Sequence, residues 1–266
     1  MSTSKEPRGR DLVLHAAVIS APLIFFTSIV FLFSEYRISP NPAVEASAAN
    51  PLGLLTSNFV YDGSINVENI VLSSVFLLVV CLYYPRELRI FMVYFVPIVA
   101  VAAGGLAELT AISSPYVSIH VCAQSCSFYG MSAVASAMVG FTVASFFICF
   151  GLIVVQRTTG RPVIRKSDIF TERTGLRGQA ILVSAFVVYV VLLLFFSGAI
   201  ALPSAPSGHQ SPGGSSPPPA IFTQTAPVAL VHTASITYGF LLCLATFALV
   251  NRRYHVFVSP AGQDRV

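Results

Sequence analysis

The fold is decided by the stretch Gly130-Met131-Ser132-Ala133-Val134-Ala135-Ser136-Ala137-Met138-Val139-Gly140, which opens an apolar run continuing past Phe150. On a helix, at about 100° per residue, its small side chains share one broad face. Such a face lets a neighbouring helix approach closely, as helices do inside a bilayer. Ser132 stands near the helix start, where free N–H groups and the helix dipole favour negative charge. Its hydroxyl is therefore either a nucleophile or a packing serine, and this stretch alone leaves both interpretations open.

The composition of the chain is that of a polytopic membrane protein. Of its 266 residues, 55% are hydrophobic and only 10% are charged, and the mean hydropathy is +0.78. Soluble globular domains do not reach these values. The five cysteines do not have the spacing of metal ligands. We expect neither a metal ion nor an organic cofactor. Cys122 and Cys126 stand close together in a polar connection, and whether they form a disulfide depends on the compartment.

The apolar runs predict an all-α fold, a bundle of six transmembrane helices. The expected spans are 12–33, 67–84, 88–109, 128–155, 179–202 and 226–250. We expect a basic cytoplasmic N-terminus over 1–11, one membrane domain over 12–250 and a cytoplasmic tail over 251–266. The span that begins near 128 should be enclosed by the other helices. The connection 203–225, rich in Pro, Gly and Ser, has no apolar periodicity and is expected to be flexible.

The basic residues predict the orientation of these spans. With a cytoplasmic N-terminus, 14 of the 15 Lys and Arg residues lie on the cytoplasmic side, and only Arg37 lies outside. This distribution follows the positive-inside rule. We therefore expect a multi-pass protein of the plasma membrane with both termini in the cytoplasm.

Three polar residues fall in the outer halves of their predicted spans: Asn69, Ser132 and His232. Ser132 lies about four residues into its span and His232 about six, so both should lie roughly 6–10 Å below the outer rim. His232 shares a small-residue face with Ser235 and Gly239, where a histidine is either a structural hydrogen-bonding group or a catalytic base. Ionisable residues inside a span suggest function.

Two further ionisable residues receive other interpretations. Glu108, near the outer end of its span, is expected to be a structural partner for a neighbouring donor rather than a catalytic acid. His120 is a rival base by its proximity in sequence to Ser132, although it belongs to an external connection.

These motifs together resemble the rhomboid family of intramembrane serine proteases. The family carries G-x-S-G on its fourth core helix, followed by a small residue, an aliphatic residue and a glycine. Here that pattern reads Gly130-Met131-Ser132-Ala133, then Ala137-Met138-Val139-Gly140. The family's H-x-x-G-x-x-x-G reads His232-Thr233-Ala234-Ser235-Ile236-Thr237-Tyr238-Gly239. The family's second-helix asparagine corresponds to Asn69, after a lead-in that begins at Phe59.

The resemblance implies a Ser–His dyad that cleaves transmembrane segments of other proteins. Ser132 would be the nucleophile, His232 the general base and acid, and the Asn69 side chain with the Ser132 backbone N–H would hold the oxyanion. Helix packing would fall to Gly130, Ala137, Gly140, Ser235 and Gly239. The expected partners are membrane-protein substrates and the lipid bilayer, not nucleic acid.

The chain departs from the family pattern at four positions. Ser235 stands at the first glycine after the histidine. Ile65 stands at the second-helix histidine, with Asn66 one residue away. Ala133 replaces a glycine, and Ser136 replaces an aromatic residue. These departures support an alternative, a catalytically inactive rhomboid-like protein that binds or escorts membrane clients. An unrelated six-helix transporter is disfavoured because the sequence shows no inverted repeat and no second buried charge.

Overall fold

The computed structural model describes residues 20–32, 50, 52–60, 64–84, 86–114, 131–159, 176–196 and 226–254. Within these residues the chain is helical apart from a few residues in turns. They are a helix Ser20–Leu32, α2 (Gly53–Thr56), the 3-10 helix η1 (Ser57–Phe59), α3 (Ser64–Cys81), α4 (Arg86–Ser113), α6 (Ser132–Thr159), α8 (Leu176–Phe196) and α9 (Ala226–Tyr254).

Four of these helices are long and apolar enough to cross a membrane: Leu88–Ser113, Ser132–Thr159, Leu176–Phe195 and Ala229–Arg252. Two shorter apolar helices, Ser20–Leu32 and Ile65–Cys81, fall where the sequence predicted the first and second spans. The all-α membrane fold is therefore confirmed for the described part of the chain.

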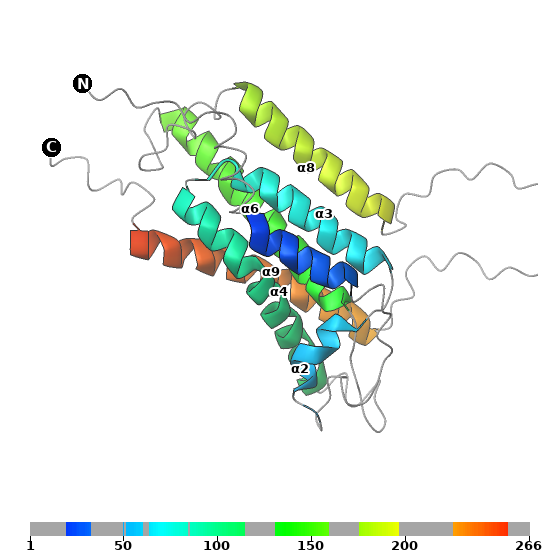
Figure 1. Ribbon diagram of the computed structural model, residues 1–266. Coiled ribbons are helices and arrows are strands. Elements are labelled where there is room, and N and C mark those ends of the chain that lie inside the picture. Colours follow the sequence, from blue (N-terminus) through cyan, green and yellow to red (C-terminus); the bar gives the residue numbers. More distant parts are fainter. Residues whose placement is uncertain are drawn as a thin grey trace, which may run out of the picture.

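α6 is the central helix of the bundle, as expected from its small residues. It packs against α3, α4, α8 and α9, and its buried residues occupy most of its circumference. Figure 1 shows α6 in green running between the other helices, with its N-terminal end beside the orange N-terminal end of α9. The two helices therefore run parallel, and their first turns lie at the same end of the bundle.

Three of the predicted boundaries differ in the structure. α6 begins at Ser132, because the Met131 carbonyl accepts the first helical hydrogen bond, from the Ala135 N–H at 2.8 Å. α3 ends at Cys81, whose carbonyl accepts from Arg89 at 2.9 Å. α4 continues past 109 to Ser113, and the Thr110 hydroxyl within it bonds back to the Leu106 carbonyl at 2.8 Å.

α8 is attached to the bundle by aromatic side chains. The Phe186 ring stacks on Phe146 of α6 at 3.8 Å between centroids, and Tyr189 stacks on Phe76 of α3 at 4.6 Å. The Tyr189 hydroxyl also shares a 2.9 Å hydrogen bond with Ser73. Most other described side chains of α8 are exposed, so these rings provide much of its attachment.

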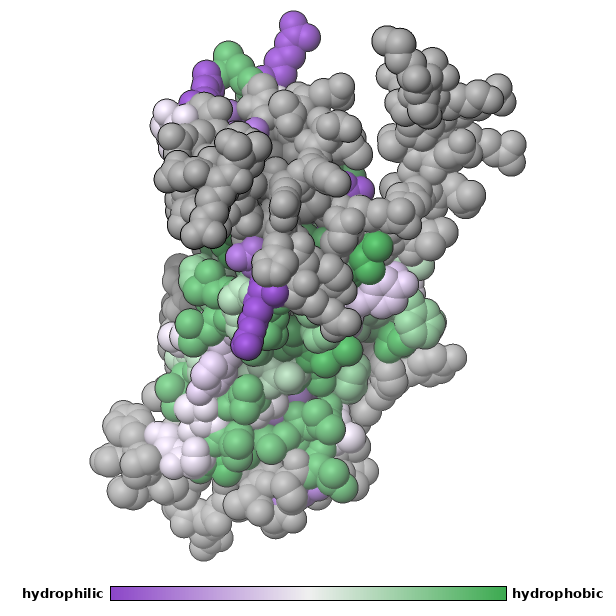
Figure 2. Space-filling view, turned by 90° about the vertical axis from the view of Figure 1, so that its left-hand side faces the viewer, coloured by the Kyte–Doolittle hydropathy of each residue, from purple (hydrophilic) through white to green (hydrophobic). Residues whose placement is uncertain are grey.

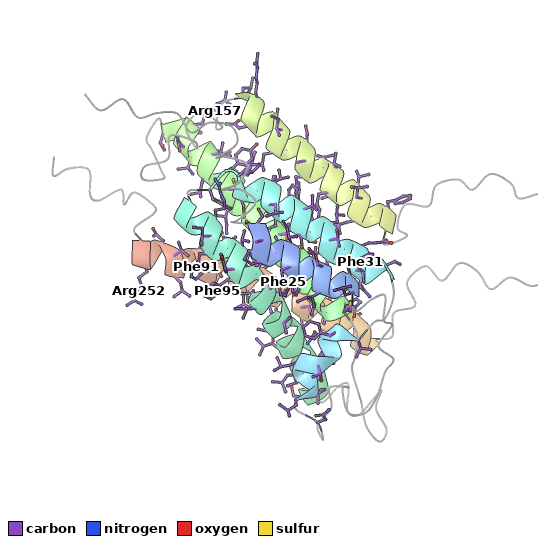
Figure 3. All side chains as sticks on the ribbon, in the orientation of Figure 1. Phe25, Phe31, Phe91, Phe95, Arg157 and Arg252 are labelled. Atoms are coloured by element: carbon purple, nitrogen blue, oxygen red, sulfur yellow. The ribbon has the colours of Figure 1, made fainter. Side chains whose placement is uncertain are left out.

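The outer surface of the bundle is apolar, as a bilayer requires. Figure 2 shows apolar side chains, in green, gathered over the face that it presents. Figure 3 shows Phe25 and Phe31 on the helix Ser20–Leu32 and the stacked pair Phe91 and Phe95 on α4, with ring centroids 4.0 Å apart. Phe25 is 68% exposed and Phe31 is 53% exposed, which matches side chains in contact with lipid.

Basic residues gather at one end of this bundle. Figure 3 shows Arg157 near the end of α6 and Arg252 near the end of α9. Because these helices are parallel, the two arginines mark the end of the bundle opposite to Ser132. α4 begins with Arg86 and α8 carries Arg177 in its first turn, and Figure 1 shows both of these helices starting at that same end.

Candidate functional site

The site is built on the contact between α6 and α9, where two glycines remove the side chains that would keep the helices apart. A Cβ at Gly140 would overlap the carbonyl oxygen of Ile236, and a Cβ at Gly239 would overlap the carbonyl oxygen of Ala137. Each helix thus presents a glycine to the backbone of the other. Ala137 and Ser235, the other small residues predicted to pack here, are fully buried.

The two glycine contacts fix the register of the helices. In these pairs the residue numbers of α6 and α9 differ by 96 and 102, so a residue of α6 is level with the residue of α9 about 99 positions later. Ser132 is therefore level with position 231, one residue before His232. Ser132 and His232 therefore lie at similar depth on neighbouring helices that run in the same direction.

Ser132 and His232 lie within the first two turns of their helices. Ser132 is the first residue of α6, and His232 is the seventh residue of α9. Both side chains are half-buried, and the Nε2 atom of His232 is buried. Next to them, Ala133 and Val231 pack with Ala107 and Ala111 of α4 in an apolar cluster. Low-dielectric surroundings of this kind strengthen electrostatic interactions.

Asn69 lies deeper than Ser132 in the register between α3 and α6. The Phe76–Phe146 ring contact joins positions of the two helices that are 70 residues apart. By this register Asn69 is level with about position 139 of α6, seven residues beyond Ser132. Seven residues of helix correspond to about 10 Å. The assignment of Asn69 to the oxyanion stays a prediction.

The neighbouring residues of α3 also differ from the expected pattern. Ile65 is 47% exposed, so its side chain is directed away from the buried face. Asn66 is half-buried and shares the face of Ile70 and Ser73, which are fully buried. Asn66, rather than Ile65, is the residue of this first turn that is directed into the bundle.

Several buried polar atoms have no hydrogen-bond partner among the described residues. They include the Oγ atom of Ser235 on α9, the Oγ1 atom of Thr142 on α6 and the Oδ1 atom of Asn69 on α3. Unsatisfied buried polar atoms are rare in folded proteins and call for an explanation, such as water or a ligand. Ser136, half-buried one turn after Ser132, adds a further small polar group on α6.

A second polar contact lies at the outer end of α4, and the sequence predicted only one of its two residues. Glu108 is buried and accepts a 2.7 Å hydrogen bond from the Ser57 hydroxyl, which confirms its expected role as a partner for a neighbouring donor. The donor itself was not anticipated. The available indication was the pair Gly104 and Gly105, which lies one turn before Glu108 and marks a close approach of another segment.

Several predicted features lie outside the described residues: Gly130, His120, Cys122, Cys126 and the connection 203–225. Cys81, Cys149 and Cys243 are buried free thiols on α3, α6 and α9. In the part of the chain that the structure describes, no group of three or more His, Cys, Asp or Glu side chains is arranged to hold a metal ion.

The chain matches no family model, no curated protein and no solved structure, so the rhomboid resemblance rests on the residues themselves.

Proposed function

We propose that this protein is an intramembrane serine protease of rhomboid type, with six transmembrane helices and a Ser132–His232 dyad. The observation that carries the proposal is the register of α6 and α9. Two mutual glycine contacts set Ser132 level with the residue next to His232, at the ends of parallel helices. A Ser–His dyad requires the two residues at similar depth on neighbouring helices, so this register supports the proposal.

In the proposed reaction, His232 takes the proton of the Ser132 hydroxyl as the serine oxygen attacks a peptide carbonyl of the substrate. The same imidazole then gives the proton to the leaving amine. Water completes the cycle by hydrolysing the acyl-enzyme, again with His232 as the base. No carboxylate is needed as a third member of this dyad.

The oxyanion of the tetrahedral intermediate requires hydrogen-bond donors close to Ser132. α6 begins at Ser132, and the first-turn N–H groups of a helix point out of its N-terminal end, where the helix dipole also favours negative charge. We assign the oxyanion to these backbone donors. Asn69 lies about seven positions deeper, so Asn66 is the better candidate for a side-chain donor.

The substrates would be transmembrane segments of other membrane proteins that enter between helices. α8 packs mainly on α3 and is the least buried of the four candidate spans, so it is the helix that can move at the least cost in packing. The basic residues at one end of the bundle support a cytoplasmic location for that end under the positive-inside rule. The dyad would then open toward the outer face of the plasma membrane.

A catalytically inactive client-binding protein is the second candidate. It is favoured by three departures from the family pattern: Ile65 in place of the second-helix histidine, Ala133 in place of a glycine, and Ser136 in place of the aromatic residue that packs on the histidine. The packing of α6 against α9 would be the same in a protein without catalytic activity.

Covalent labelling of the protein in intact membranes with a fluorophosphonate separates the two candidates. The protease is expected to be labelled at Ser132, and both Ser132→Ala and His232→Ala should prevent labelling. A wild-type protein that remains unlabelled, although correctly folded, would favour the client-binding function.

A further inference from the structure

A carboxyl group is buried where α4 meets the segment formed by α2 and η1. Glu108 is 1% exposed, Ser57 is fully buried, and the Ser57 hydroxyl donates to Glu108 Oε2 at 2.7 Å. An ionisable side chain in a membrane span is costly to bury and is retained for function or for a specific structure. The dyad does not use Glu108, so its burial needs another explanation.

The segment that carries Ser57 is fitted closely onto α4. A Cβ at Gly105 would lie 2.7 Å from the Leu54 carbonyl oxygen, and a Cβ at Gly104 would overlap Asn58 Oδ1. Asn58 Nδ2 donates to the Leu54 carbonyl at 2.7 Å, a hydrogen bond that links η1 to α2 within the segment. Figure 1 shows α2 beside the C-terminal end of α4. The glycine pair and the Glu108–Ser57 bond therefore hold one end of this segment.

The other end of the segment holds the start of α6. The Val60 N–H bonds to the Ser57 carbonyl at 3.1 Å, and the Val60 carbonyl accepts from the Met131 N–H at 3.1 Å. Met131 immediately precedes Ser132, and its carbonyl accepts from Ala135 in the first turn of α6 at 2.8 Å. An unbroken path of hydrogen bonds and chain thus leads from Glu108 through Ser57 and Val60 to Ser132.

We propose that Glu108 and Ser57 are positioning residues that fix the first turn of α6, and with it the Ser132 hydroxyl, at the level of His232. Helix ends fray unless their backbone groups are bound. Here the residue before the helix is tied to a segment that is itself anchored on a third helix. The inference rests on the proposed function only for what Ser132 does; the anchoring of α6 is independent of it.

The decisive measurement is amide hydrogen exchange at Met131 in the full-length protein. Glu108→Ala and Ser57→Ala are expected to speed this exchange about tenfold, the effect of losing one buried hydrogen bond. Glu108→Gln keeps an acceptor oxygen and should return exchange close to the wild-type rate. Unchanged exchange at Met131 in both alanine variants would overturn the proposal.

Thr110→Val provides the matched control. It removes a 2.8 Å hydrogen bond between Thr110 and Tyr238 at the same end of α4, on a path that does not lead to Met131. Exchange at Met131 should stay at the wild-type rate. Equal acceleration by Thr110→Val would show a general loosening of α4 and would also overturn the proposal.

The rate of fluorophosphonate labelling links this anchoring to the reaction. In Glu108→Ala the maximal labelling rate should fall by up to about 10²-fold, because a displacement of about 1 Å costs this much, while the reagent's half-saturating concentration stays unchanged. Faster exchange at Met131 with an unchanged labelling rate would overturn the link to Ser132. A wild type that is not labelled at all overturns the proposed protease, and the exchange measurement then still decides the anchoring.

Discussion

Gly140 of α6 and Ile236 of α9 are in backbone contact, and no side chain other than hydrogen fits at position 140. Helices in a bilayer gain little from hydrophobic burial against one another, so close packing of this kind carries much of their association. Together with the Gly239–Ala137 contact, it sets the register that brings Ser132 level with the residue before His232. The stability of the bundle and the relative depth of these two residues therefore depend on the same contact between helices.

Gly140→Ala should destabilise the bundle, because the added methyl group must displace the Ile236 carbonyl. We expect a loss of about 1–3 kcal/mol, as for other overpacked interiors. Thermal unfolding in detergent measures this effect. Gly151→Ala is the control on the same helix, since a Cβ there meets nothing within 4 Å. That variant should be neutral or gain up to about 1 kcal/mol from helix propensity, and equal losses at both positions would contradict the packing described here.

Ser132→Ala and His232→Ala should each abolish cleavage of a model transmembrane substrate while leaving the fold intact. Loss of the serine hydroxyl should cost about 1 kcal/mol of stability, typical of a single substitution. Cleavage by the purified variants, measured beside their unfolding temperatures, checks both parts. Ser136→Ala, one turn further along the same helix, is the matched control and should keep most of the activity. Equal cleavage by wild type and Ser132→Ala would exclude Ser132 as the nucleophile.

The register of α3 makes opposite predictions for its two asparagines. Asn66→Ala should lower the cleavage rate by about 10²–10³, the effect of losing one oxyanion donor, whereas Asn69→Ala should have little effect. Steady-state rates at saturating substrate distinguish the two variants. A large loss in Asn69→Ala with none in Asn66→Ala would restore the assignment made from the motif.

Ile65→His is a second test of the alignment of α3 with the second helix of the family. The motif predicts that a histidine at position 65 restores a missing donor and raises the rate. The side chain of Ile65 is 47% exposed, so we expect the cleavage rate of Ile65→His to stay within about twofold of wild type, whereas a rise of about 10²-fold would correspond to a restored oxyanion donor. A rise of that size would mean that position 65 faces the reacting carbonyl.

Tyr189→Phe should loosen α8 without unfolding the rest of the bundle. The substitution removes the 2.9 Å hydrogen bond to Ser73 and keeps the ring that stacks on Phe76. A buried hydrogen bond contributes about 0.5–1.5 kcal/mol, so local exchange in α8 should become faster by up to about tenfold. Exchange across α6 should stay unchanged, and if α6 exchanged faster as well, α8 would not be a separable element.

The sequence predicted the packing of α6 well because small residues leave a periodic pattern. Gly140 and Ala137 lie on the predicted face, and α9 covers that face. The start of α6 could not be predicted in the same way. Its position depends on the Met131–Val60 hydrogen bond. A contact between residues 71 positions apart produces no periodic pattern in the sequence. The partner of Glu108 was missed for the same reason.

The motif identified Asn69 by its distance in sequence from Phe59. A distance along the chain does not show which residue of a neighbouring helix lies at the same level. The Phe76–Phe146 contact supplies that register, and aromatic pairs between helices cannot be read from one sequence. The direction of Ile65 depends in turn on which side of α3 faces α6.

The α6–α9 contact also has a consequence for the assembly of the protein during synthesis. Chains are made from the N-terminus, so α6 enters the membrane well before α9 exists. Until then the Gly140 face lacks the helix that covers it. A nascent or truncated chain without α9 is therefore incompletely packed, and it also lacks His232. Under the proposed function such a chain would have no base for Ser132, so the proposed protease could not act on the membrane proteins inserted beside it before α9 is in place.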